Sequence, residues 1–395
     1  MNVVFPFARA GRTVSDMRAY ARERAYDRIG ALAGEGLDLV SLWRESAEVI
    51  QRAVPHYLAP CWMTLDPASL LITSHFNEYI PVLPAESLTR EYDADDVNQL
   101  ADVARSPDGA STLHEATGGD PRSTARWQSN IEMGADQELI VALRTATGDA
   151  WGGLGLYREP GAALFDRDEI DFARAIAPLL ADGARRALLL GEATDPEGPE
   201  APGLVVLSSA WELESATPGV ERWLSDLPEG DWDGGRLPSA VLTVAAQALR
   251  SAEGHDEPGE VALARVLTRS GRWVVLHGAT LVSEGRRRIA VIVEPAHPAR
   301  IGPLLMSAYG LTDREQDVTR LVLQGESTAT IADRLVVSAH TVQQHLKSIF
   351  EKTGVRSRRD LVGKVFFSYY EPRLRDNESR VPQDKPIRGG PLADA

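Results

Sequence analysis

SAHTVQQHLKSIFEK, residues 338–352, has the spacing of an amphipathic helix. If each residue turns the helix by about 100° and Val342 is set at 0°, Leu346 falls at about 40° and Ile349 at about −20°. These three apolar side chains therefore share one face. Ser338 is a preferred helix-capping residue at the start of the stretch. The sequence predicts a helix that begins after this serine and buries one apolar stripe.

The opposite face of this helix carries side chains that suit the edges of DNA bases. Glutamine can bond an adenine through two hydrogen bonds, and lysine suits the acceptors of guanine. An ordinary surface helix would favour alternating Glu and Lys at these positions. We therefore expect base reading by His340, Gln343, Gln344 and Lys347.

A second group of side chains lies at the edge and beyond the end of the predicted helix. Hydroxyl groups, cations and the free N–H groups of a helix start are the usual ligands of DNA phosphates. The residues predicted to contact the DNA backbone are Ser338, Thr341, His345, Lys352, Arg356, Ser357 and Arg358.

The surrounding sequence predicts three more short helices. Thr312 and Glu315 have the spacing of a capping box, Ser327 is a second cap, and a turn at Val336–Ser338 leads into the helix described above. A fourth helix is expected from Ser357, with Leu361, Val362 and Val365 buried. Two short helices joined by a tight turn form a helix-turn-helix, so an all-α unit of four helices is expected at 305–370.

The charge of the chain is distributed unevenly. Residues 311–375 contain 11 Lys and Arg against 8 Asp and Glu, a net charge of +3. The whole chain of 395 residues carries −15, which leaves −18 for the rest. Residues 338–375 alone carry 8 basic against 3 acidic side chains, a net +5. The positive charge is therefore concentrated where DNA contact is expected.

The predicted helical unit resembles the LuxR-type DNA-binding domain. The match comprises Leu311-Thr312, Arg314-Glu315, Gly325, Ser327, Ile331-Ala332, Leu335, Ser338, Thr341-Val342, His345, Ile349, Lys352, Gly354-Val355 and Ser357-Arg358. The resemblance implies base-facing positions for Gln343, Gln344 and Lys347, and backbone-facing positions for Thr341, His345 and Lys352. Thr328-Ala329-Thr330 replaces the Asn-Lys-Glu that is frequent in that family, which removes one cation expected near phosphate.

The sequence before this unit predicts two mixed α+β domains built on antiparallel sheets. Residues 22–190 resemble a GAF domain, with helices at both ends, an opening hairpin at CWMTLDPASLLITS and a second hairpin around Gly148. Residues 204–298 resemble a PAS domain in the order of their strands. A Gly- and Pro-rich linker is expected at 191–203 and a disordered tail at 371–395. The predicted fold class is therefore multidomain α+β followed by an all-α helix-turn-helix domain.

These features predict a one-component transcriptional regulator that binds double-stranded DNA, acts as a homodimer and responds to a small-molecule effector. No metal or cofactor is expected, because His56, His75, His114 and Cys61 match no metal spacing. No enzyme activity is expected either, since catalytic motifs and phosphate-binding loops are missing from the sequence. The alternative is a signalling protein whose helical unit contacts a protein such as RNA polymerase. The absence of a signal peptide and of a long apolar run predicts a cytoplasmic location without membrane contact.

Overall fold

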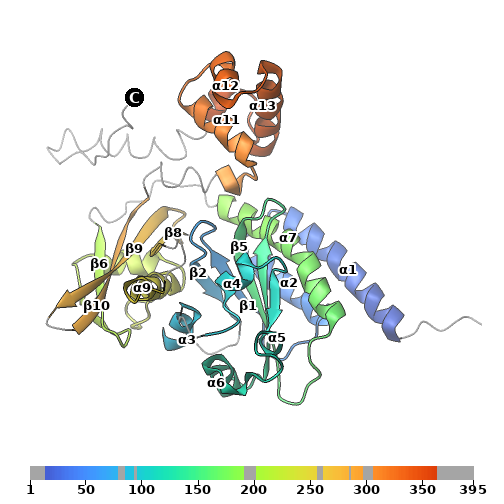
Figure 1. The fold of residues 1–395 in the computed structure, drawn as a ribbon, viewed down its shortest axis with the longest axis vertical. Coiled ribbons are helices and arrows are strands. Elements are labelled where there is room, and N and C mark those ends of the chain that lie inside the picture. Colours follow the sequence, from blue (N-terminus) through green and yellow to red (C-terminus); the bar gives the residue numbers. More distant parts are fainter. Residues whose placement is uncertain are drawn as a thin grey trace, which may run out of the picture.

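The computed structural model describes residues 14–78, 85–92, 96–190, 202–255, 261–283, 286–296 and 306–362. They form two five-stranded antiparallel sheets that lie side by side and a C-terminal group of helices at one end (Figure 1). Almost all of the predicted linker 191–203, and the whole predicted tail 371–395, lie outside the described residues. Within the described ranges, none of the helices has the length and apolar character that a membrane crossing requires.

The first sheet has the strand order β2-β1-β5-β4-β3. Its strands are β1 (Cys61–Leu65), β2 (Ile72–Phe76), β3 (Ala110–Thr112), β4 (Gln137–Arg144) and β5 (Ala150–Arg158). β1 pairs with β2, and β4 with β5, in antiparallel register, so both predicted hairpins are confirmed. The turn between β4 and β5 contains Gly148 at a φ of 98°, a backbone conformation that glycine adopts without strain.

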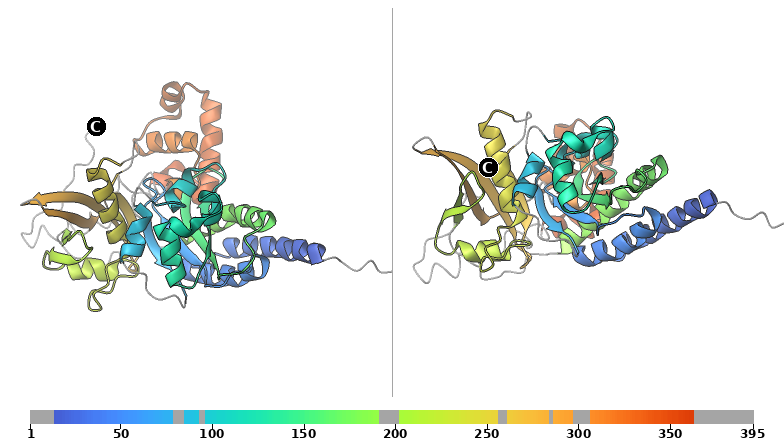
Figure 2. Two further views of the ribbon diagram at one scale, coloured as in Figure 1. Left: turned by 60° about the horizontal axis from the view of Figure 1, so that its bottom comes forward. Right: turned by 90° about the horizontal axis from the view of Figure 1, so that it is seen from below.

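Two long helices cover one face of this sheet, α2 (Leu39–Ala53) and α7 (Arg167–Leu190), and a third, α1 (Val14–Gly34), packs on both of them. Trp43 of α2 stacks on Trp62 of β1 with ring centroids 4.5 Å apart, in the core that joins the helices to the sheet. Glu169 and Asp166 exchange hydrogen bonds with each other's backbone N–H, and this capping box starts α7. α1 begins before residue 22 and extends past the rest of the molecule (Figure 2).

Short segments cover the other face of the first sheet: α4 (Leu100–Arg105), α5 (Leu113–Ala116), η2 (Pro121–Ser123) and α6 (Ala125–Glu132). Next to them, α3 (Ala85–Thr89) and η1 (Arg90–Tyr92) pack against the core of the second unit. β5 is buried along its whole length because it is covered on both faces. A Cβ atom on Gly153 would lie 2.5 Å from the Leu100 side chain, so glycine at this position lets α4 approach the sheet closely.

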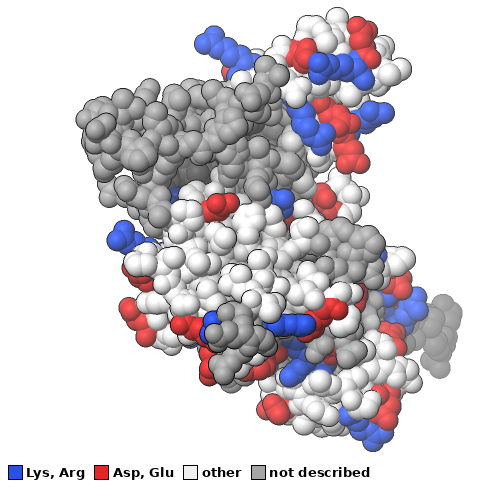
Figure 3. All heavy atoms as spheres, turned by 60° about the vertical axis from the view of Figure 1, so that its left-hand side comes forward, with Lys and Arg blue, Asp and Glu red and all other residues white. Residues whose placement is uncertain are grey.

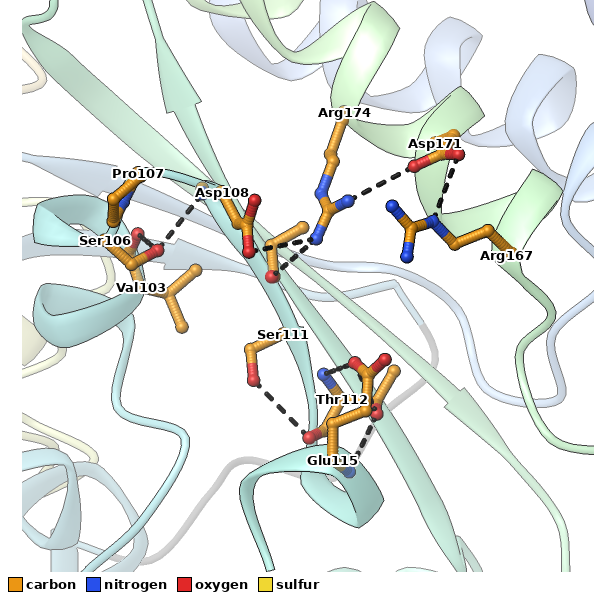
Figure 4. A network of polar contacts seen from close by, with 12 residues as sticks. Val103, Ser106, Pro107, Asp108, Ser111, Thr112, Glu115, Arg167, Asp171 and Arg174 are labelled. Carbon is orange, nitrogen blue, oxygen red and sulfur yellow. Dashed lines mark hydrogen bonds and ion pairs between the residues drawn. The ribbon is translucent and has the colours of Figure 1, made fainter. Parts of the chain in front are cut away.

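Arg174 of α7 ties the edge strand β3 to the long helices (Figure 4). Its guanidinium donates to the Ala110 carbonyl at 3.4 Å and pairs with Asp108 at 3.8 Å and Asp171 at 3.2 Å. Arg167 also reaches Asp171, at 3.4 Å. These contacts are half-exposed, so they position the edge more than they stabilise it.

The second sheet has the order β7-β6-β10-β9-β8. It comprises β6 (Gly203–Leu207), β7 (Leu213–Ala216), β8 (Leu263–Leu267), β9 (Trp273–Ser283) and β10 (Arg286–Pro295), with α8 (Val220–Asp226) and α9 (Ser239–Ala252). Residues 289–293 of β10 pair with β6, whereas Arg287 and Arg288 pair, within the described residues, with β9 alone, so this end of β10 has an open edge on the β6 side. Arg287 pairs with Glu253 at 2.8 Å.

α9 is buried on nearly all sides because it lies between the second sheet and the first unit. Thr243 of α9 donates to the Ile72 carbonyl of β2 at 2.7 Å. The side chain of Asp66 is fully buried. It accepts hydrogen bonds from the Arg265 guanidinium at 2.9 Å and from the Arg265 backbone N–H at 2.8 Å. The two sheet units are therefore joined by a buried, hydrogen-bonded interface. Their assignment to GAF-like and PAS-like folds stays a prediction.

The C-terminal unit contains α11 (Asp313–Leu323), α12 (Thr328–Leu335) and α13 (Ala339–Thr353) around its own apolar core. Residues 358–362 are also helical, as predicted, and Leu361 is 2% exposed. Val362 was expected to be buried, which is wrong, since it is 38% exposed. It lies on the outer side of this last described turn, and Val365 lies outside the described residues.

Candidate nucleic-acid interface

The candidate interface is built on α13. The Ser338 hydroxyl accepts from the Thr341 N–H at 3.0 Å and caps the helix, as predicted. Val342 and Ile349 are fully buried and Leu346 is 7% exposed, so the predicted apolar stripe is confirmed. The opposite face of α13 must therefore point away from the core of the unit.

The turn before α13 fixes its angle to α12. Val336 ends α12 in a left-handed conformation with φ 54° and ψ 49°, and its side chain is 89% exposed. The next residue, Val337, donates its N–H to the Ala332 carbonyl at 3.0 Å. Such a left-handed residue reverses the chain within two or three residues. α12, this turn and α13 thus form a helix-turn-helix.

The four predicted base-reading residues share the outer face of α13, and all four are exposed: His340, Gln343, Gln344 and Lys347. The ring Nε2 of His340 lies 3.1 Å from the Gln344 side-chain nitrogen. Lys347 lies 4.0 Å from Glu351, and both side chains are more than two-thirds exposed. Exposed pairs of this kind contribute at most about 1 kcal/mol, so these side chains can turn towards another partner.

The predicted backbone-contacting residues fall into two groups. Ser338, Thr341 and His345 lie on or beside the first half of α13, and the Ser338 and Thr341 hydroxyls are 2.8 Å apart. Arg356 is exposed after the helix, and the Ser357 hydroxyl accepts from the Asp360 N–H at 3.0 Å. These five residues are exposed or half-buried, and their contact with phosphate stays a prediction.

The other two predicted backbone-contacting residues, Lys352 and Arg358, are engaged within the unit. Lys352 donates to Glu315 of α11 at 2.6 Å. Arg358 donates to the Glu326 carbonyl at 2.6 Å and to the Thr328 hydroxyl at 3.1 Å, at the start of α12. Both cations therefore hold helices together, and only their remaining N–H groups could reach a phosphate.

Glu315 has a role that the sequence interpretation missed. It closes the predicted capping box by accepting from the Thr312 N–H at 2.8 Å. Its carboxylate also accepts from Ser348 and Lys352 of α13, each at 2.6 Å. These hydrogen bonds outweigh burial and hold the pKa of Glu315 below its ordinary value. Glu315 and Lys352 both match the LuxR-type pattern at their positions, and this joint match was the sequence signal that could have indicated their contact.

The unit contacts the first sheet unit through the short helical segment 306–308. Arg185 of α7 donates to the Ala308 carbonyl at 2.5 Å, and the Ser307 hydroxyl donates to Asp149 at 2.5 Å. Ala308 also packs on the fully buried Trp151 of β5. This contact leaves the outer face of α13 exposed. On the side shown in Figure 3, basic and acidic side chains intermix over the C-terminal helices.

Residues 310–365 match the family described as bacterial regulatory proteins, luxR family. These residues form a LuxR-family helix-turn-helix domain, the class that the geometry of α12 and α13 defines. A relative from Mycobacterium bovis, named as an inferred HTH-type transcriptional regulator, is 52% identical over 55 residues. That match covers 14% of this chain and only 6% of the relative, so the chain spans a small part of its length.

Two solved structures give weaker similarity. A bacteriophytochrome of R. palustris is 13% identical, with a TM-score of 0.31, over 73% of this chain and 64% of that one. The VqmA dimer of Vibrio cholerae, described as a LuxR-type receptor, is 16% identical, with a TM-score of 0.18, over 42% of this chain and 82% of that one. Scores this low define neither the fold nor the ligand of the two sheet units.

Proposed function

We propose that this chain is a sequence-specific DNA-binding transcriptional regulator rather than an enzyme. The observation that carries the proposal is the exposed row His340, Gln343, Gln344 and Lys347 on the second helix of a LuxR-family helix-turn-helix. In this motif the second helix enters the major groove and its side chains meet base edges. The net +5 of residues 338–375 supports contact with phosphates.

We further propose that the regulator acts as a homodimer. Helix-turn-helix dimers read two half-sites about one DNA turn apart, which doubles the number of base contacts. α1 supports self-association, because it extends beyond the sheet unit and exposes Tyr20 and Tyr26 to about two-fifths or more of their area. The sheet units then control the spacing of the two recognition helices in response to a small-molecule effector.

The experiment that tests DNA reading is a selection from sheared genomic DNA. The purified full chain is incubated with the fragments at 150 mM salt, and the retained DNA is sequenced. The same selection is repeated with the small-molecule fraction of a cell extract added, in case the effector is required. We expect enrichment of an inverted repeat whose half-sites lie about 10 base pairs apart. Equal retention of all sequences under both conditions would contradict the proposal.

A further inference from the structure

We propose that the cavity between β1, β4, β5 and α6 in the first sheet unit binds a small protonated amine that also carries a neutral hydrogen-bond acceptor. This inference rests on the proposed function, because it names the chemical class of the effector. The cavity has a volume of about 70 Å³. Its apolar wall is formed by Met63, Leu88, Leu100, Met133, Ile140 and Tyr157.

The polar wall of the cavity carries more acidic than basic groups. Arg126 of α6 is 9% exposed and pairs with Glu91 at 2.6 Å, Asp96 at 3.1 Å and Glu138 at 3.4 Å. The second cation in the lining, Arg90, donates to the Ala125 carbonyl at 3.3 Å and is more exposed. Three carboxylates thus face two guanidinium groups, which leaves one negative charge in a buried site.

Such an uncompensated buried charge costs free energy unless it is protonated or paired. Burial is the main cause that raises the pKa of Glu91, and Glu138 adds to it. Burial and Glu138 also raise the pKa of Tyr157, and that of Cys61 to about 12. All three groups therefore resist taking further negative charge. Protonation of Glu91 offsets the extra negative charge, and a monovalent cation in the cavity would offset it in place of this proton.

Two buried polar atoms in the lining have no hydrogen-bond partner within the described residues. One is Oδ1 of Asp96, whose side chain is 2% exposed, and the other is Nδ2 of Asn130, a residue that is 4% exposed. The first is an acceptor that suits an ammonium group. The second is a donor that suits a hydroxyl or carbonyl oxygen. Unpaired buried groups of this kind are uncommon in folded proteins, and a ligand carrying both functions would satisfy them together.

The volume limits the size of this ligand. A cavity of about 150 Å³ holds benzene, which has six carbon atoms, and one water occupies about 30 Å³. Scaled from either value, the cavity of about 70 Å³ encloses about two or three heavy atoms, and because it is open to solvent on one side, a ligand of four heavy atoms can extend slightly out of it. 2-Aminoethanol has four heavy atoms, an amine that is protonated at neutral pH and a hydroxyl group. It is a suitable probe for the proposed ligand class.

The proposal is tested by calorimetric titration of the full chain with 2-aminoethanol hydrochloride at pH 7. We expect saturable binding of one equivalent. Ethylammonium chloride, which lacks the acceptor, should bind at least tenfold more weakly, and ethylene glycol and potassium chloride should give no saturable heat. No saturation with 2-aminoethanol up to 50 mM would overturn the proposal. An equal response to ethylene glycol or to potassium would also overturn it.

Variants of the cavity locate the site. Asp96→Asn removes the negative charge that faces the ligand and should weaken 2-aminoethanol binding at least tenfold, whereas Asp120→Asn, on the exposed surface of the same unit, should not. Met133→Phe keeps every charged group but fills the cavity, so it should abolish binding. This variant tests the site independently if Asp96→Asn does not fold. Unchanged binding by the Met133 variant would overturn the proposal.

These titrations contain no DNA, so they separate the inference from the proposed function. A chain that binds its selected DNA but no amine contradicts only the inference. A chain that binds 2-aminoethanol but no specific DNA contradicts only the proposed function.

Discussion

Glu315 holds the two helices of the DNA-binding unit that flank α12. Its carboxylate is 6% exposed and accepts hydrogen bonds from Ser348 and Lys352 across the helix interface. A hydrogen bond to a charged group contributes about 1.5–3 kcal/mol, and the value for Lys352 lies at the low end because its side chain is one-third exposed. This single residue therefore joins helix capping to the orientation of the recognition helix.

Glu315→Ala is expected to lower the free energy of unfolding of the C-terminal unit by about 2 kcal/mol. The lowered pKa of Glu315 means that its contribution is complete above the ordinary value of about 4.5 and is lost as the pH falls through the folded-state value. Urea unfolding at pH 7 and pH 3.5 measures both effects. A destabilisation that is equally large at both pH values would contradict this role for the carboxylate.

Val336 has a side chain that does not suit its backbone conformation. A β-branched residue in the left-handed region is strained by about 1–2 kcal/mol, and the 89% exposed side chain gains little from packing. Val336→Gly should therefore raise the free energy of unfolding by about 1 kcal/mol. Val336→Ala retains the Cβ atom and should gain much less. Thermal unfolding of both variants measures these changes in stability. An equal increase in the two variants would exclude backbone strain as the cause.

At the scale of elements, Gly278 sets the distance between α9 and the second sheet. A Cβ atom at this position of β9 would lie 2.5 Å from the Val244 carbonyl oxygen, which is helix backbone and cannot move alone. Gly278→Ala should therefore lower the free energy of unfolding by about 1–3 kcal/mol.

Gly30 provides the matched control for this substitution. It lies within α1, where an added Cβ would meet the Leu179 side chain at an ordinary 3.8 Å. Gly30→Ala should raise the free energy of unfolding by about 0.5–1 kcal/mol, because alanine favours helix. Urea unfolding of both variants is the measurement. A Gly278 variant as stable as the Gly30 variant would contradict the close packing of α9.

Elements that depend on local signals could be predicted from the sequence. The caps at Thr312, Ser327 and Ser338 and the apolar stripe of α13 were correct because capping and periodicity act within one or two turns. The predicted burial of Val362 was wrong, because its exposure depends on which distant element lies alongside it. For the same reason, a lone arginine such as Arg126 gave no sign of its three carboxylate partners.

At the scale of the whole molecule, a titratable pair lies where the two sheet units meet. Glu229 accepts hydrogen bonds from the Ser239 hydroxyl and from the backbone N–H of His75. The His75 ring also contacts Ser239, at 3.1 Å. Burial raises the pKa of Glu229 to about 7 and lowers that of His75 to about 4. The contact between the two units is therefore sensitive to pH.

The contributions of Glu229 and His75 to the free energy of unfolding change with pH in opposite directions. The contribution of protonated Glu229 is complete below about pH 4.5 and is lost as the pH rises through about 7. The contribution of neutral His75 is complete above about pH 6.5 and is lost as the pH falls through about 4. Glu229→Gln removes only the first effect, and the amide oxygen still accepts hydrogen bonds.

The free energy of unfolding of the wild type should therefore fall with rising pH, and that of the Glu229→Gln variant should not. The difference, variant minus wild type, should increase by about 2 kcal/mol from pH 5 to pH 7.5. The figure is reduced from the full value of the pKa change because this side chain is only partly buried. Urea unfolding of both proteins at the two pH values gives this difference. A constant difference would show that Glu229 does not titrate between them.

The central claim is that the outer face of α13 reads DNA sequence. Its most direct test is the affinity of a Gln343→Ala, Lys347→Ala double variant for the selected DNA site, measured by fluorescence anisotropy at 150 mM salt. Each base contact contributes about 1–3 kcal/mol, so the affinity should fall at least about thirtyfold. An Arg314→Ala, Gln324→Ala control on exposed positions of α11 and its C-terminal end should bind like the wild type. Wild-type affinity in the α13 variant would contradict the account.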